Sequence, residues 1–97
     1  MRVTELLDRP EKWTKGEFAR DKDGGATLFN SSAATCWCLL AALDYCYEDD
    51  MQGWREAIKH LVAALVDLHD TAEIVRWQDR PETTWEQVRV LLERANV

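Results

Sequence analysis

The clearest periodic pattern along the chain predicts a long amphipathic helix over Met51–His69. Its apolar side chains recur every three or four residues and form one stripe, whereas most of its charged side chains fall elsewhere. The stripe consists of Trp54, Ile58, Leu61, Leu65 and Leu68. The acidic residues 48–50 come directly before this helix and supply an N-cap and negative charge at its N-terminus.

A second segment, Ala33–Tyr47, is apolar nearly all round until Asp44. A surface helix would show a polar stripe, and this segment has none. Ser31 or Ser32 can cap its start. We therefore expect residues 33–47 to form a helix that other elements surround.

Shorter periodic segments lie on either side of these two. Residues 3–9 favour a first helical segment. Much later in the chain, Thr71 can cap a short helix that begins directly after this threonine. Residues 83–86 read Thr-Thr-Trp-Glu, which fits a capping box in which Thr83 binds the amide of Glu86. This box opens a last helix that runs to about Ala95.

The remaining residues show no pattern that indicates a strand or a second domain. The main loop, residues 21–32, is broken by adjacent glycines, and no alternating stretch is long enough to indicate a paired strand. No linker or repeat divides the chain. The sequence therefore predicts a compact, single all-α domain over residues 1–97, with about four to six helices packed around the buried central helix 33–47.

Charge and composition narrow the possible partners. The chain has 97 residues, enough for one domain, and 46% of them are hydrophobic, enough for a core. The formal net charge is -6, which disfavours contact with phosphate backbones and with anionic membrane surfaces. This charge permits a basic protein partner, so we expect protein partners rather than direct nucleic-acid binding.

Three cysteines raise the question of metal or redox chemistry. Cys36 and Cys38 are two residues apart, which on a helix places them about 200° apart around the axis. They cannot both ligate one ion from a continuous helix, and Cys46 offers no second pair for zinc. We interpret all three as core residues, although a reactive Cys36 in the first helical turn is an open alternative.

The start of the chain has charge throughout and no apolar leader, and no apolar run is long enough to cross a bilayer. A cytoplasmic location with free thiols is therefore expected.

Other candidate chemistry has a simpler explanation. His60 and His69 fall on roughly opposite helix faces and do not form a metal pair. The segment Arg20–Gly25 resembles a calcium loop, but Gly25 and Ser32 stand where oxygen ligands are needed, so we expect a turn held by Asp side chains. No catalytic triad or phosphate-binding motif is present. We therefore expect no metal or cofactor and favour a protein that is not an enzyme.

Three ordered motifs carry a resemblance to a known family. They read "FARDKDGG", "WCLLAAL" and "IVRWQDRPETTWEQVRVLLERA". Together they resemble a family of small bacterial and phage-encoded proteins classed as a domain of unknown function. Members carry an ARD-x-DG segment, a Trp-Cys-Leu helix that leads to Gly-Ala-Leu, and a Trp-Asn-Asp segment before a Thr-capped helix. The chain departs from this pattern at Ala41, where Gly is usual, and at Gln78, where Asn is usual. The resemblance implies a helical fold, a cytosolic location and a possible phage context.

The first functional hypothesis is a non-enzymatic protein-interaction module. In a phage context, this module would act by binding a host protein such as a defence component. A small, acidic, Trp-rich helical domain without a catalytic constellation motivates it. Tryptophan and arginine are frequent interface anchors. The expected contacts are the acidic corner and the segment 77–80, that is, Glu48, Asp49, Asp50, Trp77, Asp79 and Arg80.

Two alternatives stay open. A small-molecule binder or small enzyme would have its site where the 20–23 loop meets the 77–79 segment, with Arg20, Asp21, Asp23 and Asp79 as its residues. Homo-oligomerisation would use a leftover apolar face of the Met51–His69 helix.

Overall fold

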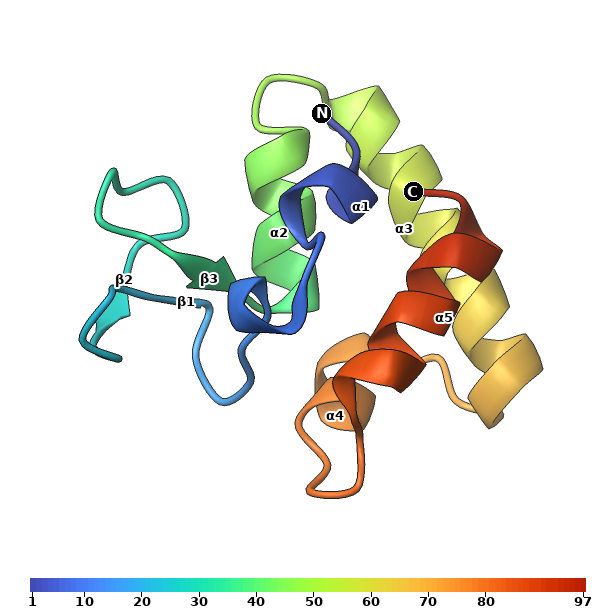
Figure 1. Cartoon of the computed structure of the whole chain (residues 1–97). Helices are drawn as coiled ribbons and strands as arrows, with labels where there is room; N and C mark the ends of the chain where they lie inside the picture. Colours follow the sequence, from blue (N-terminus) through green and yellow to red (C-terminus); the bar gives the residue numbers. More distant parts are fainter.

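The computed structural model describes all 97 residues and contains both helices and a small sheet (Figure 1). The five α-helices are α1 (Val3–Leu6), α2 (Leu39–Cys46), α3 (Met51–His69), α4 (Ile74–Gln78) and α5 (Trp85–Ala95). A 3-10 turn, η1 (Pro10–Lys12), precedes three strands, β1 (Ala19–Arg20), β2 (Ala26–Thr27) and β3 (Cys36–Trp37). The strands form an antiparallel sheet in the order β2-β1-β3. The fold is therefore mixed, and the prediction of an all-α domain is wrong.

The sheet is invisible in the sequence pattern because each of its strands has only two residues. Side-chain alternation needs a longer run before it can be recognised. Ala19 pairs with Thr27 on one side and with Trp37 on the other. Backbone bonds extend this pairing, since the Cys38 N–H donates to the Phe18 carbonyl at 2.9 Å. Long-range pairing, not local propensity, makes these segments extended.

The helix predicted over 33–47 begins at Leu39 instead. Cys36 and Trp37 belong to β3, so their backbone groups pair with β1 and Cys36 does not lie in a first helical turn. Cys38 is the N-cap, and its Sγ accepts the Ala41 N–H at 3.4 Å. The expected burial is confirmed for α2, whose residues Leu39, Ala41, Ala42 and Leu43 are all buried. This helix contacts α1, α3, α4 and β3.

Helix α3 has the bounds that its hydrophobic stripe predicts. Asp50 caps it, since its Oδ1 accepts the Gly53 N–H at 2.9 Å. Leu61 and Leu65 are fully buried, and α5 packs alongside α3 (Figure 1). Although α3 has 19 residues, none of the helices is both long and apolar enough to cross a membrane.

The cap of α5 lies one residue later than predicted. Thr84 is the N-cap, and its side chain and that of Gln87 each accept the other's backbone N–H. Thr83 is buried instead, and its hydroxyl donates to the Trp77 carbonyl at 2.6 Å. Two adjacent threonines fit the same sequence motif, and the second one caps the helix because the first is used by α4.

The two ends of the chain lie close together (Figure 1). The Arg2 guanidinium contacts the Asn96 side chain, and its Nε donates to the Val97 carbonyl at 3.4 Å. The same carbonyl accepts the Thr4 hydroxyl at 3.3 Å, and the Val97 side chain is buried. These contacts close α1 against the end of α5.

Candidate functional site

The polar end of α4 joins three distant parts of the chain. The Gln78 side chain is 1% exposed, and its Oε1 accepts the Leu39 N–H at 2.6 Å and the Trp13 indole N–H at 3.2 Å. Its Nε2 donates to Asp79 Oδ1 at 2.8 Å, and the same oxygen accepts the Gly16 N–H at 3.1 Å. We call these five residues the Gln78 junction. Because the side chain of Gln78 is buried and both of its polar atoms are hydrogen-bonded, the junction stabilises the fold.

The structure shows which of the predicted contact residues at 77–80 are free to meet a partner. Trp77 is 2% exposed and packs against the His69 ring, with the ring centroids 4.7 Å apart, so it is not available to a partner. Asp79 is exposed but holds Gly16. Arg80 has an exposed side chain, while its carbonyl accepts a bond from Lys15 Nζ at 2.7 Å. Only Arg80 is both exposed and free of a side-chain bond.

Arg20 holds its own loop. Its guanidinium donates to Thr14 Oγ1 at 3.0 Å and to the carbonyls of Lys15 at 3.3 Å and Gly24 at 3.1 Å. Asp79 fastens the next residue of the same segment through the Gly16 N–H. Arg20 and Asp79 therefore hold two sides of the 14–16 segment.

The predicted ligand pocket does not assemble from its four residues. A small hollow of about 140 Å³ is lined by Cys38, Val75, Gln78, Asp79 and residues 16–18. Arg20, Asp21 and Asp23 do not line it. The structure thus brings only one of the four predicted pocket residues to this hollow.

Asp21 makes the turn that its sequence context predicts. Its Oδ1 accepts the N–H groups of Asp23 and Gly25, both at 2.9 Å. Gly24 has a φ of +84°, which other residues rarely adopt. No group of three or more His, Cys, Asp or Glu side chains is placed to hold a metal ion.

The three thiols are free, and two of them are held in the protonated form by their surroundings. Burial raises the pKa of Cys38, and burial raises the pKa of Cys46 to about 11. Cys38 is buried, as a core interpretation requires, whereas Cys36 and Cys46 are half-buried. A thiol needs its anion to act as a nucleophile, so Cys38 and Cys46 are poorly suited to catalysis at neutral pH.

The strongest candidate site is a hollow at the turn between α2 and α3, with a volume of about 400 Å³. Three aromatic side chains, three carboxylates and one methionine line it, and no basic side chain does. The lining residues are Phe29, Asp44, Tyr47, Glu48, Asp49, Met51 and Trp54. We call it the α2–α3 hollow. An apolar wall beside uncompensated negative charge suits a ligand with an apolar stem and a positive end.

Local contacts hold the walls of this hollow in place. The Trp54 indole N–H donates to Asp44 Oδ1 at 2.9 Å, which links α3 to α2 and fixes the ring. Asn30 donates to Glu48 Oε1 at 3.2 Å and so ties the loop before β3 to the acidic corner. Met51 is 63% exposed, so its apolar side chain is accessible to a partner beside the aromatic wall of the hollow.

The sequence indicates only part of this hollow. Glu48 and Asp49 are predicted contacts that line it, whereas Asp50 is committed to capping α3. Trp54 belongs to the predicted core stripe, and nothing in the sequence links Phe29 to this hollow. The only sequence indication of the rest of the hollow is Asp44, the first charged residue in an otherwise largely apolar segment.

Gly53→Ala is expected to destabilise the protein by about 1–2 kcal/mol, although alanine is the better helix former. An added Cβ would lie 2.9 Å from the Tyr47 ring carbon Cδ1 and would collide with the Asp50 carboxylate. The variant therefore loses the cap of α3 and disturbs the hollow. Urea unfolding followed by tryptophan fluorescence measures the change. The exposed neighbour substitution Gln52→Ala is the control, and a gain in stability for Gly53→Ala would contradict this packing.

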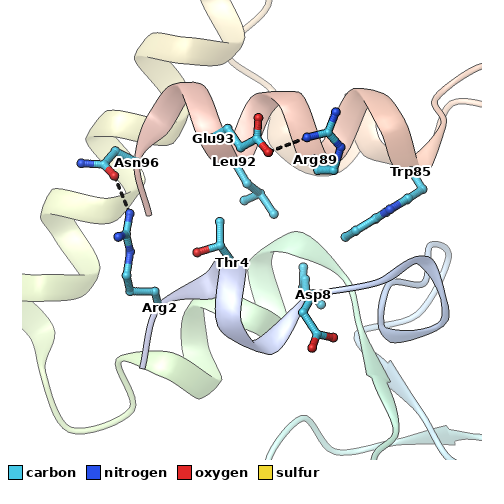
Figure 2. A pocket seen from close by; sticks show the side chains of 9 residues that line it. Arg2, Thr4, Asp8, Trp85, Arg89, Leu92, Glu93 and Asn96 are labelled. Atoms are coloured by element: carbon cyan, nitrogen blue, oxygen red, sulfur yellow. Dashed lines mark hydrogen bonds and ion pairs between the residues drawn. The ribbon is translucent and has the colours of Figure 1, made fainter.

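A second cleft, of about 410 Å³, lies between α1 and α5 (Figure 2). Figure 2 shows Arg89 and Glu93 of α5 paired above Thr4 and Leu92. Arg89 also pairs with Glu86, and Asp8 at the other wall pairs with Arg9. The charges of this cleft are therefore balanced within the protein, which leaves it less selective for a charged ligand than the α2–α3 hollow.

Comparison with known proteins adds a family but no activity. No curated protein and no solved structure matches the chain. The model of a family of unknown function, DUF6197, matches residues 1–96. Because this match covers nearly the whole chain, the protein belongs to the DUF6197 family.

Proposed function

We propose that the protein is a non-enzymatic protein-interaction module and that the α2–α3 hollow is its contact face. The observation that supports this most is the composition of the hollow, which combines three aromatic side chains and an exposed Met51 with three carboxylates. Aromatic residues and methionine are enriched at protein interfaces, and Trp and Tyr are frequent among the few residues that supply most of the binding energy.

The charged groups elsewhere on the helices support the same choice. On the surface of α5, Arg89 pairs with Glu86 and Glu93, and Asp67 of α3 pairs with Arg94. None of the carboxylates in the α2–α3 hollow forms an ion pair. A basic partner would supply the missing charge and would be attracted over a distance by the net charge of -6.

Catalysis has weaker support. The His69 ring packs on Trp77, and His60 lies exposed on α3. No hydrogen bond joins either histidine to a serine, threonine or cysteine side chain that could serve as a nucleophile. If the chain is phage-encoded, as the family resemblance implies, its partner is a host protein such as a defence component.

A pull-down with matched variants tests this function. Tagged protein is incubated with nuclease-treated lysate of the source cell, or of its host, and captured proteins are quantified by mass spectrometry. Wild type is expected to capture one protein in stoichiometric amount, and Met51→Ala is expected to capture about tenfold less of it. Val66→Ala, an equally simple truncation of another exposed side chain of α3, serves as the control. Undiminished capture by Met51→Ala, or no captured protein, would overturn the proposal.

A further inference from the structure

We infer that the α2–α3 hollow receives an arginine side chain from a basic segment of the protein partner. This inference rests on the proposed function and names the chemistry that the contact face selects. It follows from the walls of the hollow, from their charge and from the size of the space.

The aromatic walls suit a guanidinium group. Tyr47 and Trp54 line the hollow, and the bond from Trp54 to Asp44 holds the indole ring before any ligand arrives. A guanidinium is planar and weakly hydrated, so it stacks on aromatic rings while its N–H groups bind carboxylates. The three-carbon stem of arginine can lie along Met51 and Phe29, which line the same space.

The charge of the hollow favours a cation over every other class of guest. Asp44, Glu48 and Asp49 carry three of the negative charges of the chain, and no Lys, Arg or His side chain lines the hollow. Glu48 receives a bond from the neutral Asn30, and Asp44 receives one from the neutral Trp54. An acidic guest would be repelled, and a neutral guest would leave the carboxylates without compensation.

The size of the hollow fits a side chain and not a large cofactor. Its volume of about 400 Å³ is near the lower end of the roughly 300–1,000 Å³ that ligand pockets span. The hollow is open to solvent along the exposed residues Glu48, Asp49 and Met51. A side chain can therefore enter it while the backbone of the partner stays at the surface.

A pair of small probes tests this inference on the full chain. The ¹⁵N-labelled protein is titrated with N-acetyl-arginine amide and, separately, with N-acetyl-citrulline amide, which has nearly the same shape but no charge. The indole N–H signal of Trp54 and the backbone signals of residues 47–54 report binding. The arginine probe is expected to shift these signals saturably, with a dissociation constant about tenfold below that of the citrulline probe.

Paired charge variants complete the test. Glu48→Gln/Asp49→Asn is expected to remove most of the preference for arginine. Asp23→Asn/Glu82→Gln changes the net charge by the same amount at two exposed sites outside the hollow and is expected to keep the preference. Equal shifts with the two probes, shifts that map elsewhere, or a preference that survives in Glu48→Gln/Asp49→Asn would overturn the inference.

The two proposals fail separately. Unselective binding of the probes would overturn the cation inference, while capture that depends on Met51 would still support the interaction module. Selective binding of arginine without a partner that depends on Met51 would overturn the proposed function and the protein origin of the cation.

Discussion

Gln78→Leu is expected to lower the free energy of unfolding by about 3–4 kcal/mol. Leucine has a similar volume but no polar atom, so the buried Leu39 N–H loses its acceptor. The Trp13 indole N–H loses the same partner, and Asp79 loses a donor. A buried donor left without a partner costs about 1–3 kcal/mol, and a domain of this size has only about 5–15 kcal/mol to lose.

Urea unfolding followed by tryptophan fluorescence measures this change. Gln52→Leu is the matched control, because Gln52 is exposed on α3 and makes no side-chain hydrogen bond. The control is expected to change stability by no more than about 0.5 kcal/mol. If Gln78→Leu were as stable as the control, the Gln78 junction would not stabilise the fold.

Leu61→Ala is expected to cost about 3 kcal/mol because Leu61 is fully buried on the face of α3 that meets the core. The loss combines the apolar area returned to water with the cavity left between α3 and its neighbours. In a chain of this length, 3 kcal/mol corresponds to a fall in Tm of roughly 12–24 °C. Thermal unfolding followed by circular dichroism at the helical band gives this value.

Val66→Ala is the control for Leu61→Ala, since Val66 lies on the same helix but is 46% exposed. Its expected cost is below about 1 kcal/mol. Similar losses for the two variants would mean that α3 does not pack on the face that carries Leu61.

Hydrophobic periodicity predicts the secondary-structure elements that are long enough to repeat their pattern several times. Helix α3 repeats its apolar stripe over 19 residues, so its bounds could be predicted. Of the stripe itself, Leu61 and Leu65 are buried, whereas Leu68 is exposed. The sheet could not be predicted, because β1, β2 and β3 are each two residues long and exist only through pairing between distant segments. The same pairing places Cys36 and Trp37 in a strand and delays the start of α2 to Leu39.

The candidate site shows a similar division. The sequence marks the acidic corner at 48–50 by charge alone, and Glu48 and Asp49 do line the hollow. Its aromatic wall could not be predicted, since Phe29 comes from a loop and Trp54 shares the spacing of core residues. In the sequence, Gln78 stands out only as a departure from the family pattern, yet it is the buried centre of a hydrogen-bond network because α4 turns it inward.

The Gln78 junction also has a consequence for the rate at which the protein opens. Its two bonds to Oε1 join residues that are 39 and 65 positions apart in the chain, so the loops they close are long. Because closing a long loop costs more chain entropy than closing a short one, we expect these contacts to form after the nearer ones and to contribute little to the folding transition state. Loss of the junction is then expected to accelerate unfolding and to leave the refolding rate almost unchanged. The Gln78 side chain would then control the lifetime of the native state. Where cleavage is faster than refolding, it would also control the resistance of the chain to proteolysis.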